Sequence, residues 1–186
     1  AVIQADGGTG EFESVILDTA AYEAVYNGSA DFVIPFKTWE GIEAELNDEP
    51  LKYFEYEDYG IPDSYSVIII AADDWLAANG DVADRFLRAT KKGFEFAAAN
   101  PQEGGQILID ANPGVFNAPE LVFQSAELMA SEYYLDGNGS WGTIDLSQFG
   151  GYSSWLYNAG IVVDGSGNAL DGEPDWAEFI DNSHLD

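Results

Sequence analysis

The chain has 186 residues, 46% of them hydrophobic and 14% aromatic, a composition typical of a folded protein. Its 34 acidic residues against 6 basic ones give a formal net charge of −28, which argues against nucleic acid or a membrane surface as a partner, because both are anionic. The sequence contains no cysteine, so disulfides, thiolate metal sites and thiol nucleophiles are excluded.

The first third of the chain alternates strand and helix patterns. It opens on AVIQADGG, which is typical of the last turn of a helix closed by glycine, so we expect that a beginning is missing. Alternation of strands with helices implies parallel pairing. The predicted elements are a strand over Phe12–Asp18, a helix over Thr19–Tyr26, a strand over Asp31–Phe36 and a helix over Trp39–Leu46.

Two more strand patterns follow, and after them the spacing of apolar residues becomes helical. Lys52–Tyr56 alternates as a strand does, and Val67–Ala71 is uniformly apolar, as in a strand covered on both faces. Beyond it the apolar residues recur at helical spacings, so the natural division of the chain lies near Ser64–Val67. The predicted helices are Asp81–Ala99, Gln102–Asp110, Pro119–Tyr134 and Ser147–Ala159, with a short segment over Trp176–Asn182.

Three stretches together carry a family resemblance. They are GSADFVIPFKTWEGIEAE (28–45), FEYEDYGIPDSYSVIIIAADDWLAANGDVADRFLRATKKGFEFAAANPQEG (54–104) and GSWGTIDLSQFGGYSSWLYNAGIV (139–162). In order and spacing they resemble the later part of the thiamine-pyrimidine and riboflavin-type solute-binding proteins of ABC importers. The fungal thiamine-pyrimidine synthases share that fold family.

The resemblance implies an α/β fold of the type II periplasmic-binding-protein kind, with two lobes around one ligand. Residues 1–64 would be part of the second lobe, and residues 65–186 a hinge strand and the mostly helical part of the first, whose own beginning is absent. It further implies an extracytoplasmic protein, a flat heteroaromatic ligand such as a thiamine-precursor pyrimidine, an ABC permease as partner, and neither catalysis nor a cofactor. A chain without part of a sheet exposes edges that a second copy could cover, so we expect a homo-oligomer.

Trp39 and Glu40 are the first candidate ligand residues. They follow the predicted strand Asp31–Phe36, and in open parallel sheets ligands lie beyond the carboxyl ends of the strands. The indole could stack on a heteroaromatic ring while the carboxylate accepts a hydrogen bond from an amino group. The alternative is that Trp39 belongs to the core and Glu40 is a favourable acid at a helix N-terminus.

Tyr59 and Tyr65 are the next candidates. They belong to the turn-rich stretch EYEDYGIPDSY, in which glycine and proline enforce a turn. In the resembled family a loop of this kind lines the cleft. The alternative is an exposed acidic turn whose tyrosines fold back onto the protein.

Two other classes of function remain open at this stage. Asp164–Asp175 partly matches a calcium-binding loop, with Ala169 where the template requires glycine, so a calcium-dependent surface module is one alternative and an acidic turn is the favoured interpretation. A relative of the pyrimidine synthases is the other, although the cysteine-rich motif of those enzymes is absent. We expect His184 to be an exposed residue of the tail.

Overall fold

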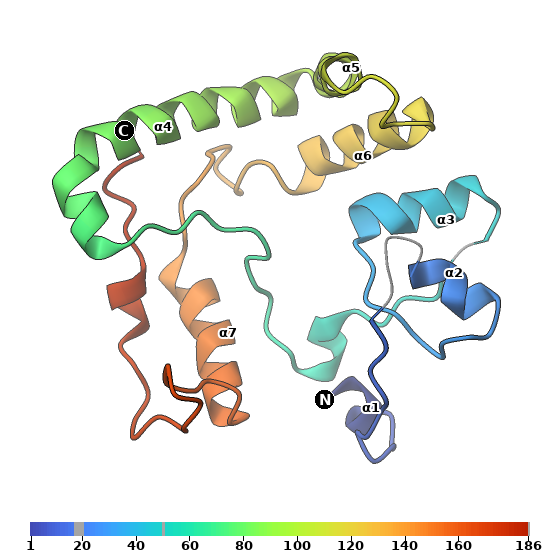
Figure 1. Ribbon diagram of the computed structural model, residues 1–186, viewed down its shortest axis with the longest axis horizontal. Coiled ribbons are helices and arrows are strands. Elements are labelled where there is room, and N and C mark those ends of the chain that lie inside the picture. The colour runs from blue at the N-terminus through green and yellow to red at the C-terminus, as the bar shows by residue number, and fades with distance from the viewer. Residues whose placement is uncertain (17–20, 50, 186) are drawn as a thin grey trace. The chain divides into compact units, whose positions relative to one another are not determined.

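The computed structural model of the protein describes residues 1–16, 21–49 and 51–185. Helices connected by irregular segments make up the described chain (Figure 1). The longer helices are α4 (Asp73–Ala99), α5 (Pro101–Ala111), α6 (Pro119–Glu132) and α7 (Leu146–Asn158). The shorter ones are α1 (Val2–Ala5), α2 (Ala21–Tyr26), the π-helix η1 (Lys37–Gly41) that runs into α3 (Ile42–Leu46), and the 3₁₀ turns η2 (Tyr56–Tyr59) and η3 (Trp176–Phe179).

Proline and asparagine set the boundaries of the long helices. Helix α4 ends at Ala99, because Asn100 leaves the helical region (φ −138°, ψ 59°) and Pro101 opens α5 at a position that needs no N–H donor. Pro119 opens α6 in the same way. Inside α4 a kink lies at Asn79 (φ −134°), whose side-chain amide donates to the carbonyl of Trp75 at 2.8 Å. The predicted helices of this region are therefore confirmed, and α4 begins earlier than its periodicity indicates.

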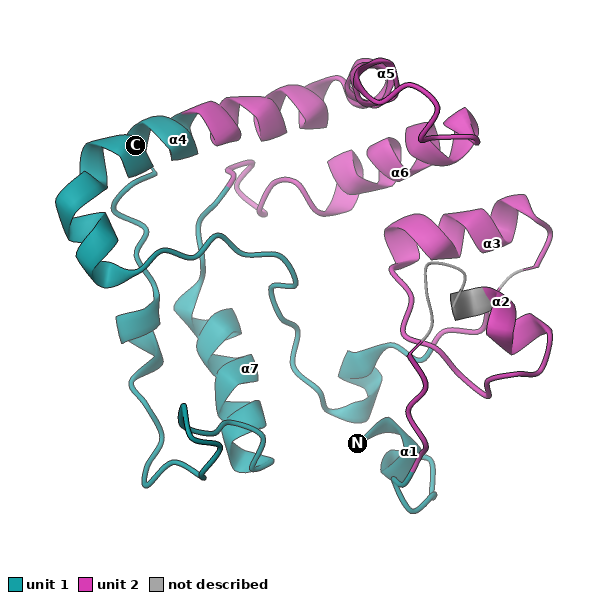
Figure 2. Ribbon diagram, in the orientation of Figure 1, with its two compact units in different colours: residues 1–11, 54–88, 142–186 teal, residues 12–53, 89–141 magenta. Residues whose placement is uncertain are grey.

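The described chain divides into two compact units, and each contains segments that are far apart in the sequence (Figure 2). Unit 1 consists of residues 1–11, 54–88 and 142–186, and unit 2 of residues 12–53 and 89–141. One of the points at which the chain passes from one unit to the other falls within α4, after Arg88. The predicted division into lobes near Ser64–Val67 stays a prediction.

In unit 2 the core forms where α5, α6 and α3 meet. Leu121 and Val122 of α6 are 5% and 3% exposed, and Ala44 of α3 is completely buried. Gly105 of α5 is buried as well, and a Cβ atom there would lie 3.0 Å from the ring of Phe123. The glycine thus allows α5 and α6 to approach closely.

In unit 1, α7 packs against η3. The indole Nε1 of Trp176 donates to Glu173 at 2.7 Å and to the hydroxyl of Ser154 at 3.1 Å. Ser154 and Trp176 both donate to Glu173, and these hydrogen bonds lower the pKa of its carboxyl group. Ala83 of α4 is also buried in this unit.

The prediction of an α/β fold of the type II periplasmic-binding-protein kind is wrong for the described residues. They contain no strand, and their one paired extended contact is the isolated antiparallel bridge between Val163 and Ala169. Asp31–Phe36 and Val67–Ala71 are free of helix but unpaired, and residues 17 and 18 of the predicted first strand lie outside the described residues. A strand requires a second backbone to bind its N–H and C=O groups, and the side-chain pattern contains no information on that partner.

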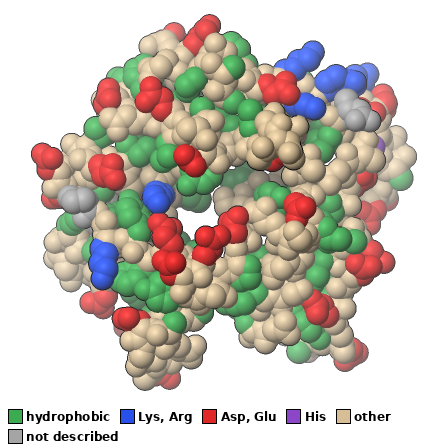
Figure 3. Space-filling model, turned by 180° about the vertical axis from the view of Figure 1, so that it is seen from behind, with side chains coloured by type: hydrophobic (Ala, Val, Ile, Leu, Met, Phe, Trp, Pro, Cys, Tyr) green, Lys and Arg blue, Asp and Glu red, His purple; other side chains and the backbone are tan. Residues whose placement is uncertain are grey.

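Unpaired segments leave large apolar side chains in contact with solvent. Val67 is 87% exposed, Ile70 83% and Ile34 78%. The space-filling view shows hydrophobic side chains interspersed with acidic ones over the visible face (Figure 3). No helix among the described residues combines the length and the apolarity that a membrane span needs.

The core of unit 2 gives a stability prediction. Leu121→Ala should lower the free energy of unfolding by about 2–5 kcal/mol, because it removes buried methyl groups and leaves a cavity. Leu108→Ala on α5 is the matched control, since Leu108 is 44% exposed and has less apolar area to lose. Urea denaturation of both variants measures the difference, and equal losses would contradict this description of the core.

Candidate functional site

Trp39 and Glu40 lie on η1, the π-helix between the unpaired Asp31–Phe36 segment and α3. The Glu40 carboxylate folds back on its own helix, where Oε2 accepts a hydrogen bond from the N–H of Phe36 at 3.0 Å. It thus satisfies one of the donors that a helix start leaves open. Oε1 accepts no hydrogen bond within the described part of the chain. Short π-helical turns are frequent at functional sites.

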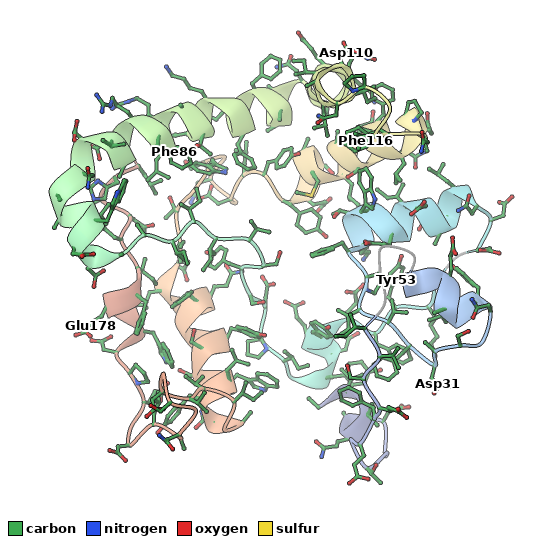
Figure 4. All side chains as sticks on the ribbon, in the orientation of Figure 1. Asp31, Tyr53, Phe86, Asp110, Phe116 and Glu178 are labelled. Atoms are coloured by element: carbon green, nitrogen blue, oxygen red, sulfur yellow. The ribbon has the colours of Figure 1, made fainter. Side chains whose placement is uncertain are left out.

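The Trp39 side chain is half-buried and lies against two features of unit 2. Its ring meets the ring of Phe116 edge-on, with centroids 6.0 Å apart, and Phe116 belongs to the connection between α5 and α6 (Figure 4). Trp39 also lines a pocket of about 120 Å³. The other walls include Ala97, Gly104, Leu108, Val122 and Tyr134.

Tyr53 also packs against η1. Its hydroxyl lies where a Cβ atom on Gly41 would be, at a distance of 2.5 Å, so glycine is required at this position. The ammonium group of Lys37 lies 5.4 Å from the centre of the Tyr53 ring, within the range of a cation–π interaction. Glycine, tyrosine and lysine together fix the helix that bears Trp39.

The second predicted cluster lies in unit 1. Tyr59 ends η2, and Gly60 follows it with φ +73°, a conformation that glycine adopts without strain. Tyr59 is half-buried, with its ring 6.1 Å from that of Phe54. The turn predicted for this stretch is confirmed, and its tyrosine packs on a neighbouring aromatic ring.

Tyr65 lies beside α7, in a second pocket. Its hydroxyl oxygen accepts a hydrogen bond from the N–H of Asp145 at 2.9 Å, and nearby Gln148 donates to Asp63 at 2.7 Å. These bonds hold the loop that bears Tyr65 against the start of α7. The pocket has a volume of about 200 Å³ and is lined by Ser64, Tyr65, Ile68, Phe149, Tyr152, Ser153 and Leu156.

Phe149 and Tyr152 of this pocket were missed by the sequence analysis. With Leu156 they follow a spacing of three and seven residues, which places them on one face of a helix. That signal was present in the sequence. The predicted residues fall into two pairs: Trp39 and Glu40 share η1 in unit 2, while Tyr59 and Tyr65 belong to unit 1.

A third aromatic group, also unpredicted, lies in unit 2. The ring of Phe94 stacks on that of Trp141 with centroids 5.0 Å apart, and meets Tyr134 edge-on at 5.3 Å. Burial raises the pKa of the Tyr134 hydroxyl, so this group stays protonated and can donate a hydrogen bond at the pocket beside Trp39.

The acidic loop considered as a calcium site is held together by its own hydrogen bonds. Asp164 Oδ1 accepts from the N–H groups of Ser166 and Asn168, both at 2.8 Å. These bonds, led by that from Asn168, lower the pKa of the Asp164 carboxyl group. Within the described ranges no group of three or more metal-binding side chains gathers at one point.

His184 is not the exposed tail residue that the sequence indicated. Its ring is half-buried, with Nδ1 2.6 Å from an oxygen of Asp84 and Nε2 3.6 Å from one of Asp181. Gly80 leaves room for it, since a Cβ atom there would lie 3.3 Å from the ring. The imidazole thus attaches the end of the chain to α4.

Comparison with known proteins gives the class of the chain. The sequence profile of the family described as NMT1/THI5 like matches residues 1–104, which is more than half of the 186 residues. The chain therefore belongs to the NMT1/THI5-like family, and the resemblance seen in the sequence is confirmed.

One curated relative of the chain is a binding protein with a described ligand. The chain is 27% identical over 162 residues to the formylaminopyrimidine-binding protein of Halalkalibacterium halodurans. The match covers 83% of this chain and 48% of the relative, so the chain spans about half the length of the curated relative it matches.

The start of α7 gives a pH-dependent prediction. Asp145 caps this helix, and hydrogen bonds from Ser147 and from the N–H of Gln148 lower the pKa of its carboxyl group. Because the carboxyl pKa is lower in the folded protein than in the unfolded chain, the ionised carboxylate stabilises the fold above about pH 4. This contribution disappears as the pH falls through the pKa of the folded state. The melting temperature of Asp145→Asn should therefore be lower than that of the parent at pH 7, with the difference closing toward pH 3.

Asp171→Asn is the control, because Asp171 is exposed and makes no hydrogen bond within the described residues. Its melting temperature should follow that of the parent across the same pH range. If the Asp145→Asn difference persisted unchanged at pH 3, the charged cap would not be its cause.

Proposed function

We propose that the protein binds a single-ring aminopyrimidine as the solute-binding component of an ABC importer. The relative whose role is described binds a formylaminopyrimidine, and the family to which the chain belongs is consistent with such a ligand. An extracytoplasmic location and an ABC permease as partner are parts of the same proposal. The chain would act by binding alone, without a cofactor.

The observation that carries the proposal is the Trp39–Glu40 pair. A flat heteroaromatic ligand needs an aromatic face and a hydrogen-bond acceptor for its exocyclic amino group. Trp39 supplies an indole at a pocket. Glu40 supplies a carboxylate oxygen, Oε1, that accepts no hydrogen bond from the described residues. A carboxylate that accepts from an amino group forms a stronger bond than a neutral acceptor does.

Pocket size distinguishes the two ligand classes that the resemblance allows. The pocket beside Trp39 measures about 120 Å³ and the one beside Tyr65 about 200 Å³, both below the roughly 300–1,000 Å³ that accommodates drug-sized ligands. A pyrimidine is a single ring, whereas a flavin has three fused rings. The sizes favour the pyrimidine. Tyr59 and Tyr65 of unit 1 stay proposed ligand residues in their own right, Tyr65 at the second pocket.

Ligand binding should raise the melting temperature of the protein, because a ligand that binds only the native state stabilises it by mass action. We expect a shift with formylaminopyrimidine and related aminopyrimidines, and none with sugars or amino acids. The reverse pattern would contradict the proposal. Formation of a pyrimidine by the protein in the presence of iron and a cofactor would replace it with the synthase alternative.

Two substitutions test the residues. Trp39→Ala and Glu40→Gln should each weaken binding by about 1–3 kcal/mol, the first through loss of the stacking face and the second through loss of a charge-assisted hydrogen bond. Trp75→Ala is the matched control, since Trp75 lies on α4 and is 46% exposed. Calorimetric titration measures all three, and parent-like affinity in both site variants would remove Trp39 and Glu40 from the site.

Self-association belongs to the proposal as well. The exposed apolar residues of Val67–Ala71 could be covered by a second copy of the chain, while the charge of −28 opposes contact between copies. Salt screens that repulsion, so the molar mass by light scattering should rise toward a dimer or larger species as ionic strength increases. A monomer at every salt concentration would contradict it.

A further inference from the structure

Two asparagines of the chain occur in the sequence Asn-Gly-Ser. They are Asn27-Gly28-Ser29 and Asn138-Gly139-Ser140, and no other asparagine has serine or threonine two positions later with a residue other than proline between. This pattern is the acceptor sequence for N-linked glycans, and it requires a surface position in an exported protein. Both sites belong to unit 2.

Asn27 lies at the surface directly after α2, where the chain turns. Gly28 has φ +76°, and both Asn27 and Ser29 are exposed. The Asn27 side-chain oxygen accepts hydrogen bonds from the N–H of Ser29 at 3.0 Å and from its hydroxyl. The amide nitrogen makes no hydrogen bond with the described residues, so the reacting atom faces solvent with the serine hydroxyl beside it.

Asn138 lies at the tip of a separate small loop. Asp136 closes this loop, because its N–H donates to the carbonyl of Ser140 at 2.8 Å and its carboxylate accepts from the N–H groups of Asn138 and Ser140. Gly139 has φ +76°. The Asn138 side chain is exposed and makes no hydrogen bond within the described part of the chain.

We propose that Asn27 and Asn138 are acceptor sites for N-linked glycans. The donor would be an oligosaccharide linked to a membrane lipid through phosphate, and a membrane-bound transferase of the host would catalyse the step. The amide nitrogen forms a bond to the anomeric carbon of the first sugar, the bond from that carbon to the phosphate oxygen breaks, and the lipid phosphate leaves. A basic group of the transferase takes the amide proton. This inference rests on the proposed extracytoplasmic function, because donor and transferase act on exported chains.

A second loop of the same construction supplies a matched control. In residues 164–168, Asp164 makes the same hydrogen bonds as Asp136, with its N–H donating to the carbonyl of Asn168 at 2.8 Å. Gly167 repeats the positive φ of Gly139, at +82°. Serine and asparagine are interchanged in this loop, which reads DGSGN in place of DGNGS. The loop therefore has the shape of an acceptor site without its sequence.

The test is the mass of the protein purified from its native host, by intact and peptide mass spectrometry. We expect glycan on both Asn27 and Asn138. Ser29→Ala and Ser140→Ala should each remove one glycan, whereas Ser29→Thr should retain it. Asn47→Gln, a change at an exposed asparagine outside any acceptor sequence, should leave both glycans in place. The double change Ser166→Asn with Asn168→Ser should add a third.

Cell fractionation separates failure of this inference from failure of the proposed function. If the protein is exported but both asparagines are unmodified, or are converted only to aspartate, the proposal of glycan sites is wrong and the proposed function is unaffected. Protein confined to the cytoplasm would contradict both. Loss of a glycan in Asn47→Gln would show that the sites depend on overall folding and overturn the assignment by sequence.

Discussion

The close approach of α5 to α6 is the contact on which the candidate ligand site depends. It is possible because Gly105 has no side chain where a Cβ atom would lie 3.0 Å from Phe123. The same pair of helices buries Leu121 and Val122 and supplies walls of the pocket beside Trp39. Helix η1 contacts α6 directly. The position of the indole therefore follows from how closely two helices pack, although neither helix adjoins Trp39 in the sequence.

Local features of the chain could be predicted from sequence alone. Helices α5, α6 and α7 follow from apolar periodicity and from Pro101 and Pro119, because periodicity and proline act within a few residues. The placement of Trp39 and Glu40 at the start of a helix could be predicted for the same reason. The loop with Gly60 follows from the conformational freedom of glycine.

Contacts between distant residues could not be predicted in this way. Tyr65 accepts from the N–H of Asp145, 80 positions away, and nothing near Tyr65 in the sequence identifies that partner. The strand predictions failed for a related reason. Val67–Ala71 has the residues of a strand, but whether such a segment pairs depends on a second backbone, which local composition does not specify.

Acidic residues contribute to local structure as well as to net charge. Asp136, Asp145 and Asp164 each accept hydrogen bonds from backbone N–H groups at a turn or a helix start. A carboxylate in this position stabilises the turn by binding donors that would otherwise need water. Part of the acidic content therefore stabilises loops, which accounts for calcium-like sequence patterns without a gathering of metal ligands among the described residues.

Binding of an aminopyrimidine against Trp39, as proposed, can be followed directly at the indole ring. The protein contains five tryptophans, so labelling with fluorotryptophan gives one ¹⁹F resonance for each, and single Trp→Phe variants assign them. Titration with formylaminopyrimidine should shift the Trp39 resonance in a saturable way and leave that of Trp75 unchanged. Saturable binding by calorimetry with an unmoved Trp39 resonance would contradict the account.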